Sequence, residues 1–341
     1  MRTYERALGL AAAREGPALR GTADMHVGLS DLHRERGDLG AARQHLSISQ
    51  ELGERAGLAQ NRYRWRVALA RVRQAEGDPA GALGLLDEAE RLYAGDFFPN
   101  VRPVAAWRAR TWVGLGRLDE ALAWARERGL SAEDELGYLR EFEHVTLARA
   151  LLARSTTDRA DRPVRETVAF LERLLRAADA GGRTGSVIEI LVLLALAHHA
   201  LRDLPDALAP LERALTLAEP EGYVRVFVDE GPPLASLLEA AGRRGIAPRY
   251  VRRLLAASGG AGHRPPAGQE LVEPLSEREL DVLRLLGSDL DGPDIARELV
   301  VSLNTVRTHT KSIYSKLGVN TRRAAVRRAE ALGLLPRAGT P

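Results

Sequence analysis

The segment Gly37-Asp38-Leu39-Gly40-Ala41-Ala42 decides the fold, because its pattern returns at three further places in the 341-residue chain. In each copy an alanine stands five positions after the first residue of a turn. The copies lie about 40 residues apart, except that the last interval is about two such periods and the turn is missing near residues 156–163. The further copies are Gly77-Asp78-Pro79-Ala80-Gly81-Ala82, Gly116-Arg117-Leu118-Asp119-Glu120-Ala121 and Arg202-Asp203-Leu204-Pro205-Asp206-Ala207.

A turn of this kind ends one helix and begins the next, and the small alanine lets the two helices approach closely. Most of the sequence around these turns has helical periodicity. One helix pair cannot bury its apolar face alone, so successive pairs stack into a superhelix. The pattern resembles tetratricopeptide-type repeats with a longer period, and we expect them over residues 1–222. Residues 3–13 have the pattern of the second helix of a pair whose first helix is absent.

Three further regions follow the repeats. Residues 223–256 form a joint, in which Tyr-Val-Arg-Val-Phe-Val at 223–228 favours a strand or an extended connector. Residues 257–274 carry four glycines and three prolines, which oppose a helix and predict a flexible linker. The remaining residues, 275–341, form the last domain. The expected fold class is therefore all-α: a helical-repeat superhelix followed by a small helical domain.

The composition excludes several kinds of chemistry. The chain has no cysteine, which removes disulfides, cysteine zinc sites, iron–sulfur clusters and thiol nucleophiles. Lysine occurs only at Lys311 and Lys316, and neither follows a glycine, so a Walker A loop is absent. His198 and His199 are adjacent and face different directions on a helix, which favours packing over a metal site. We expect no enzyme, no cofactor and no metal.

Nothing in the sequence indicates a membrane. The first twelve residues have no apolar run after their charges, so they do not form a signal peptide. The most apolar stretch, residues 187–197, is much shorter than the roughly 20 residues of a spanning helix, and we expect it to be a buried helix. The absence of cysteine agrees with a reducing, cytoplasmic location.

Aromatic residues are concentrated in the middle repeats, between residues 63 and 142. They could line a groove for a small inducer, because ligand pockets are mostly apolar. They could instead fill the space between paired helices, where a repeat core needs bulk opposite alanine. We prefer the second interpretation, and the first stays open. The residues are Tyr63, Trp65, Tyr93, Phe97, Phe98, Trp107, Trp112, Trp124, Tyr138 and Phe142.

The positive charge of the chain is concentrated in its last domain. The chain has 49 basic and 46 acidic residues, a net charge of +3. Residues 275–341 hold 11 basic and 8 acidic residues, so the whole imbalance lies there. Residues 305–328 contain seven basic residues and no acidic one. A small domain with such a segment suggests a polyanion as its partner.

Four short helices are expected in this domain from their caps. Six apolar residues of the first two helices should face inward: Leu280, Leu283, Leu286, Ile295, Ala296 and Leu299. In the third, Val306, Thr310, Ile313 and Leu317 share one stripe, while Asn304, Arg307, Thr308, Lys311 and Ser315 share the opposite face. The four helices should begin, in order, at a capping box over 276–279, at Asp291 with Pro293 in the first turn, at Ser302, and at Asn320 or Thr321. A short second helix, a tight turn and a basic third helix predict a helix-turn-helix, whose second element fits a major groove.

Four motifs in this domain closely resemble the DNA-binding domain of LuxR-type transcriptional regulators: Leu275-Ser276-Glu277-Arg278-Glu279, Asp294-Ile295-Ala296, Asn304-Thr305-Val306-Arg307-Thr308-His309 and Ile313-Tyr314-Ser315-Lys316-Leu317-Gly318-Val319. The resemblance implies that Arg307, Thr308 and Lys311 read bases and that Thr305 and the start of the fourth helix lie near phosphates. The implied DNA-binding set is Asn304, Thr305, Arg307, Thr308, His309, Lys311, Arg322 and Arg323. The turn at 289–293 departs from the family, because it adds Asp289 and Asp291 and lacks the usual lysine.

Helical repeats followed by this domain resemble the large ATP-dependent, MalT-like class of these bacterial regulators, without their amino-terminal ATPase. The resemblance implies a sequence-specific transcription regulator whose repeats sense a small-molecule or protein effector. It also implies double-stranded DNA as a partner, a homodimer on DNA and a contact with RNA polymerase. The alternative is a helical-repeat interaction scaffold whose tail packs on protein.

Overall fold

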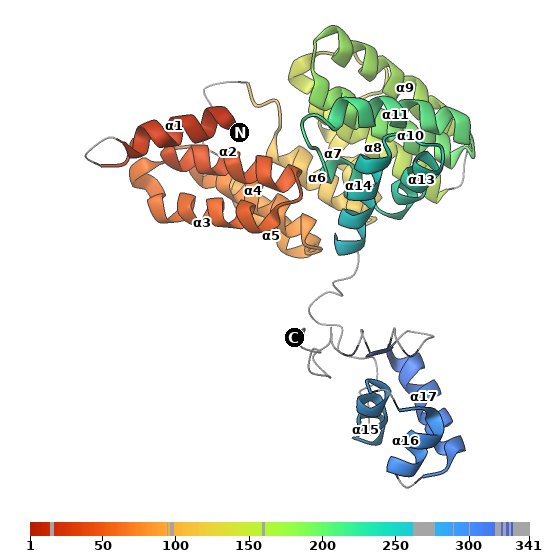
Figure 1. Cartoon of the computed structure of the whole chain (residues 1–341). Coiled ribbons are helices and arrows are strands. Elements are labelled where there is room, and N and C mark those ends of the chain that lie inside the picture. Colours follow the sequence, from red (N-terminus) through yellow and green to blue (C-terminus); the bar gives the residue numbers. More distant parts are fainter. Residues whose placement is uncertain are drawn as a thin grey trace. The chain divides into compact units, whose positions relative to one another are not determined.

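The computed structural model describes residues 1–13, 17–93, 95, 99–158, 161–261, 277–288, 290–299, 301–317, 322, 325, 326 and 329. The chain divides into two compact units, residues 1–264 and 265–341 (Figure 1). Within the described ranges every regular element is a helix, which confirms the all-α class. No helix in those ranges is both long and apolar enough to cross a membrane.

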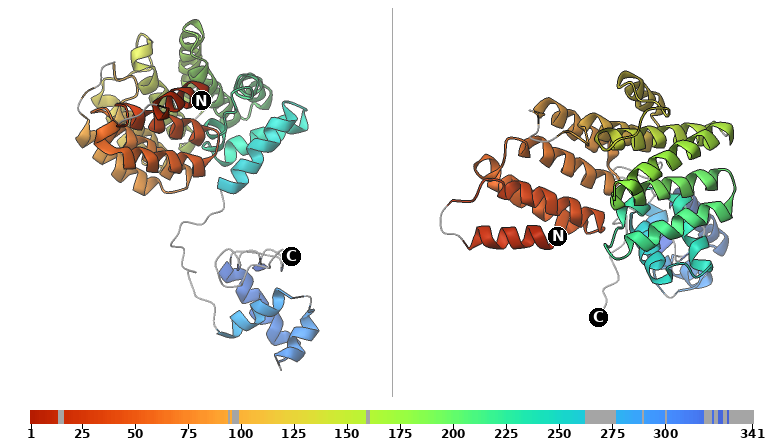
Figure 2. Two further views of the ribbon diagram at one scale, coloured as in Figure 1. Left: turned by 60° about the vertical axis from the view of Figure 1, so that its left-hand side comes forward. Right: turned by 90° about the horizontal axis from the view of Figure 1, so that it is seen from above.

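Antiparallel helix pairs follow one another through the first unit (Figures 1 and 2). Helix α1 (Arg2–Ala12) packs on the first of these pairs. The pairs are α2 (Thr22–Glu35) with α3 (Leu39–Ala56), α4 (Asn61–Ala75) with α5 (Pro79–Leu92), α6 (Val104–Gly114) with α7 (Leu118–Glu127), α8 (Glu141–Thr157) with α9 (Asp161–Ala180), and α10 (Thr184–Ala200) with α11 (Leu204–Ala218). A short 3₁₀ helix, η1 (Tyr138–Arg140), precedes α8.

The repeated turns join the two helices of a pair, as the sequence predicts. The four alanines of the pattern, Ala42, Ala82, Ala121 and Ala207, are fully buried between the paired helices. An aspartate caps the second helix of three pairs by accepting a hydrogen bond from a backbone N–H three residues later. The bonds are Ala41 N to Asp38 (3.0 Å), Gly81 N to Asp78 (2.8 Å) and Asp206 N to Asp203 (3.1 Å).

The apolar run at 187–197 lies in α10, at the centre of the largest core cluster. Ile188, Ile190 and Val192 are completely buried there, which confirms the expectation of a buried helix. Several of the clustered aromatic residues also fill the core, because Tyr63, Trp124 and Phe142 are each less than a tenth exposed. Phe97 and Phe98 lie outside the described residues.

The joint after the repeats is helical, so both alternatives expected at 223–228, a strand and an extended connector, are wrong for residues 225–228. Residues 225–228 form a single helical turn, α12 (Arg225–Val228). The N–H of Val224 donates to the carbonyl oxygen of Glu35 at 2.9 Å, and the N–H of Val226 donates to its carboxylate at 2.9 Å. Val224, Phe227 and Val228 are buried by this docking, which explains why so short a segment is rich in apolar residues. The end of the repeats is thereby attached to their beginning.

Two longer helices follow α12, and the second is longer than the sequence suggests. They are α13 (Pro232–Arg243) and α14 (Pro248–Ala261). The expectation that no helix forms from residue 257 onward is wrong for residues 257–261, since α14 runs through Gly259 and Gly260. Tyr250, Val251 and Leu254 bury one side of α14 in the core. This tertiary anchoring outweighs the cost of about 1 kcal/mol for each helical glycine. The expected linker continues over residues 262–274, which lie outside the described part of the chain.

One turn of the pattern carries strain that the others avoid. The first residue of the turn has positive φ in Gly37 (+83°), Gly77 (+86°) and Gly116 (+73°), and the same position is Arg202 (φ +60°) in the fourth copy. A left-handed backbone costs a residue with a Cβ about 1–2 kcal/mol more than it costs glycine.

We therefore expect Arg202→Gly to stabilise the first unit by about 1 kcal/mol and to raise its Tm by roughly 2–4 °C. Thermal unfolding followed by tryptophan fluorescence measures the effect, because all four tryptophans lie in this unit. Arg202→Ala is the control, since it removes the same exposed side chain and keeps the strain. An equal Tm gain in both variants would contradict the explanation.

Candidate nucleic-acid interface

The second unit has its own core, built from three described helices and the start of a fourth segment. The helices are α15 (Glu277–Leu286), α16 (Gly292–Glu298) and α17 (Leu303–Leu317). All six apolar residues expected to face inward from the first two helices belong to this core or pack against it. The buried members are Val282, Leu283, Leu286, Ile295, Ala296, Val306, Ile313, Ala325 and Ala329.

Helix α16 begins at the predicted cap. The carboxylate of Asp291 accepts a hydrogen bond from the N–H of Asp294 at 2.9 Å, and the N–H of Asp291 donates back to the Asp294 carboxylate at 3.5 Å. Pro293 stands in the first turn, where a missing N–H has no cost. The acidic residue at 291 is therefore used to start a helix. Asp289 lies outside the described residues.

Helix α17 also begins where the sequence predicts. The hydroxyl oxygen of Ser302 accepts a hydrogen bond from the N–H of Thr305 at 3.1 Å. On the inward stripe Val306 and Ile313 are buried, as expected, and Thr310 is half-buried.

The predicted DNA-binding residues fall into two groups. Thr308 is exposed, while Thr305 and His309 are half-buried on the same helix. The side chains of Asn304, Arg307 and Lys311 lie outside what the structure describes, as does the whole of Arg323. The predicted base contacts of this set stay predictions.

A buried contact that sequence reasoning missed fixes the position of α17. Glu279 is only 4% exposed, and its carboxylate accepts a hydrogen bond from the Ser312 hydroxyl at 2.6 Å. The sequence assigns Glu279 to a capping box with Ser276, which lies outside the described residues. A glutamate three residues after a serine signals a cap in a sequence, and nothing in its spacing indicates a partner 33 residues later. The bond joins α15 to the middle of α17.

Arg322 is used inside the domain. Its guanidinium donates to the carbonyl oxygens of Leu286 (2.9 Å), Leu290 (2.7 Å) and Ser288 (2.6 Å), with a longer bond to Leu285 (3.4 Å). These carbonyls belong to the last turn of α15 and to the connection that leads into α16. A planar cation at the end of a helix satisfies carbonyls that lack intrahelical partners. Its predicted phosphate contact stays a prediction, beside this structural contact that the sequence did not reveal.

Helical repeats in one unit and a helix-turn-helix in the other define a two-part protein with an interaction region and a nucleic-acid-binding domain. Residues 1–244 match the MalT-like TPR region, and residues 273–329 match the family described as bacterial regulatory proteins, luxR family. The chain therefore belongs to the MalT-like TPR family and carries a luxR-family domain.

Two similar proteins extend the comparison. The HTH-type transcriptional regulator MalT of Cronobacter sakazakii (strain ATCC BAA-894) is 28% identical over an alignment of 293 residues, and the match covers 76% of this chain and 30% of that relative. The chain thus spans less than a third of the length of this relative. A solved structure of TPR-like repeats, titled as a kinesin light chain of Podosopora anserina, is 19% identical with a TM-score of 0.35. The match covers 59% of this chain and 97% of the solved chain. The TM-score is too low to support a detailed comparison.

We expect Arg322→Ala to destabilise the second unit by about 2 kcal/mol, because it leaves several carbonyls without their donor. Arg322→Lys should cost nearly as much, since an ammonium keeps the charge and loses the planar fork. Urea unfolding of residues 265–341 followed by circular dichroism measures both. Arg284→Ala is the control, because its side chain is 62% exposed and pairs with Asp281 three residues earlier. Full stability of Arg322→Lys would contradict the structural role.

Proposed function

We propose that the chain is a sequence-specific DNA-binding transcription regulator whose helical repeats receive an effector. The observation that carries this proposal is the luxR-family match over residues 273–329, which coincides with a domain whose caps and core form a helix-turn-helix. The likeness to MalT over 76% of this chain supports the same assignment, since that relative is named as an HTH-type transcriptional regulator. The alternative, a scaffold whose tail packs on protein, is not favoured by these matches.

In this proposal α17 enters the major groove. The positions of Asn304, Thr308 and Lys311 lie across the helix from Val306 and Ile313, which are buried. Arg307, Thr308 and Lys311 contact base edges, where an arginine can bind guanine with two hydrogen bonds. Asn304, Thr305, His309 and Arg323 complete the contacts with DNA, and Arg322 supports the turn between α15 and α16.

The acidic turn before α16 shifts phosphate binding to the rest of the domain. Asp294 pairs with Arg297, and Asp291 is occupied as a helix cap, so this turn supplies no free cation among its described residues. Phosphate contacts then come from the ends of α17 and from the basic residues that follow it. Such contacts set position and affinity, whereas base contacts set sequence preference.

The remaining partners follow from the same proposal. A protein that regulates transcription acts in the cytoplasm of a bacterium, where the DNA is, and contacts RNA polymerase at its promoters. The repeats bind a small-molecule or protein effector, and two copies of the chain bind adjacent half-sites.

We expect residues 265–341 alone to bind duplex DNA, with an affinity that falls steeply as salt rises. Selection from a random duplex library with the full chain should yield a preferred sequence. Arg307→Ala should then lose about 1–3 kcal/mol on that sequence and relax the preference at one base pair.

The matched control is again Arg284→Ala, which removes the same charge from α15 and leaves α17 unchanged. It should weaken selected and random DNA about equally. Absence of DNA affinity in a folded 265–341 fragment at low salt would disprove the proposed function. Equal losses on selected and random DNA for Arg307→Ala would remove only the base-reading assignment.

We also expect the free chain to be mainly monomeric and to dimerise on DNA. Two domains related by a two-fold axis place their recognition helices about 34 Å apart, one turn of DNA. Binding to inverted half-sites about ten base pairs apart should be cooperative, with a salt dependence about twice that of a single half-site. Sedimentation velocity with each duplex measures the stoichiometry. One protomer per full site at saturation contradicts the dimer.

A further inference from the structure

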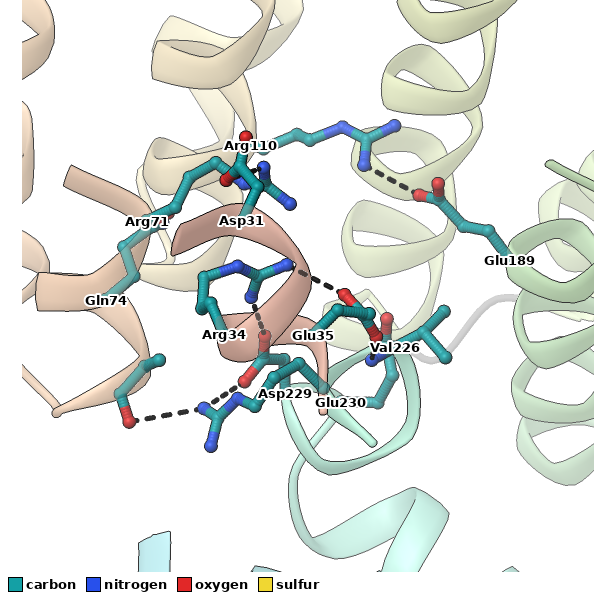
Figure 3. A network of polar contacts seen from close by, with 12 residues as sticks. Asp31, Arg34, Glu35, Arg71, Gln74, Arg110, Glu189, Val226, Asp229 and Glu230 are labelled. Carbon is teal, nitrogen blue, oxygen red and sulfur yellow. Dashed lines mark hydrogen bonds and ion pairs between the residues drawn. The ribbon is translucent and has the colours of Figure 1, made fainter. Parts of the chain in front are cut away.

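Arginine side chains from separate repeats meet inside the first unit (Figure 3). Arg71 of α4 pairs with Asp31 of α2, and Arg110 of α6 donates to Glu189 of α10 at 2.7 Å. Arg149 of α8 donates to the same Glu189 at 3.0 Å and to Glu230 at 2.6 Å. These contacts join helices that are far apart in the sequence, so the cluster forms only in the assembled superhelix.

Two aromatic rings hold these guanidinium groups in place. The rings of Trp107 and Phe142 lie with their centroids 4.6 Å apart. The guanidinium carbon of Arg71 lies 4.5 Å from the centre of the Trp107 ring, and that of Arg110 lies 3.8 Å from the centre of the Phe142 ring. Arg102, just before α6, lies over Phe142 at 5.6 Å. Stacking on a ring orients a guanidinium and leaves the N–H groups at its edge available.

The cluster has more cations than carboxylates to pair with them. Arg71, Arg110 and Arg149 share Asp31, Glu189 and Glu230, and Arg102 makes no hydrogen bond or ion pair with any described residue. One nitrogen of Arg110, Nη2, is buried and has no partner in the described part of the chain. A buried donor without a partner is costly, which makes an external acceptor favourable there.

The electrostatics agree with this count. Burial lowers the pKa of Arg71 to about 10, and the charges of Arg34 and Arg102 act in the same direction. Burial lowers the pKa of Arg110 to about 10 as well, with Arg149 and Arg102 contributing. Burial opposes ionisation of Glu189, but Arg110 and Arg149 outweigh it and lower its pKa to about 2. Arg71, Arg110 and Glu189 are therefore charged at neutral pH, and the four arginines of the cluster outnumber its three carboxylates.

Solvent can reach the cluster. The side chains of Arg71 and Arg110 are each 14% exposed, and Arg102 is exposed. We propose that Arg71, Arg102 and Arg110, on the platform of Trp107 and Phe142, bind a small ligand through an oxyanion group, a phosphate or a carboxylate. The guanidinium fork matches both groups, because each presents two oxygens in one plane. This deepens the proposed function, since it gives the chemical class of an effector of the repeats.

The test is a fluorescence titration of the full chain at constant ionic strength, with inorganic pyrophosphate in one arm and citrate in the other. All four tryptophans lie in the repeats, and Trp107 is part of the platform, so anions bound only by the tail leave the signal unchanged. We expect a saturable change with at least one anion, and the arm that saturates identifies phosphate or carboxylate chemistry.

Two variants of equal charge separate this site from general attraction. Arg102→Gln should weaken binding about tenfold or more, the effect of losing one charged hydrogen bond. Arg108→Gln is the control, because Arg108 lies on α6 six residues after Arg102, over Trp112, and pairs with Asp87. It should change the affinity by less than about twofold. The proposal is wrong if neither anion gives a saturable fluorescence change, or if the two variants lose equal affinity. Failure of the tail to bind DNA would end the proposed function and leave this binding result unaffected.

Discussion

The first unit depends on one constraint: each helix pair has an apolar face that only a neighbouring pair can cover. Fully buried alanines at every repeated turn let the two helices of a pair approach closely, and larger side chains such as Phe170 and Leu171 fill the layers between them. Because the stacking repeats, charged side chains at equivalent positions of successive pairs meet on the inside of the unit. Glu189, in the middle of the most apolar helix, is tolerated there because two arginines from other pairs hold its carboxylate.

The second unit has a different constraint, because one small core must hold the described helices α15, α16 and α17 together. Its apolar core is small, so single polar contacts matter more than they do in the repeats. Ser312 bonds to the buried Glu279, and Arg322 closes the end of α15. The first contact holds α17 against α15, and the second holds the connection between α15 and α16.

Local pattern was sufficient for predicting the helices, their turns and most of the helix-turn-helix. The buried alanines and the caps at Asp291 and Ser302 were all predictable, because a cap or a close approach is signalled within a few residues. The docked α12 was not, because a short run of mostly apolar residues does not distinguish a strand from a buried helical turn. The roles of Arg322 and Glu279 were also hidden, since their partners lie more than 30 residues away in the sequence. The arginine cluster needed the assembled superhelix for the same reason.

The bond from Val226 to Glu35 spans 191 positions of the chain. In an open solenoid every contact is local, so the terminal repeats can fray without disturbing the rest. Here α12, which follows the last repeat, holds the first pair, and fraying of α2 also removes the support of α12. The contact raises the mean sequence separation of native contacts, which slows folding because a long loop must close before the contact forms. The repeat unit should therefore fold slowly and unfold as one cooperative body. A change that destabilises one end should then also destabilise the other.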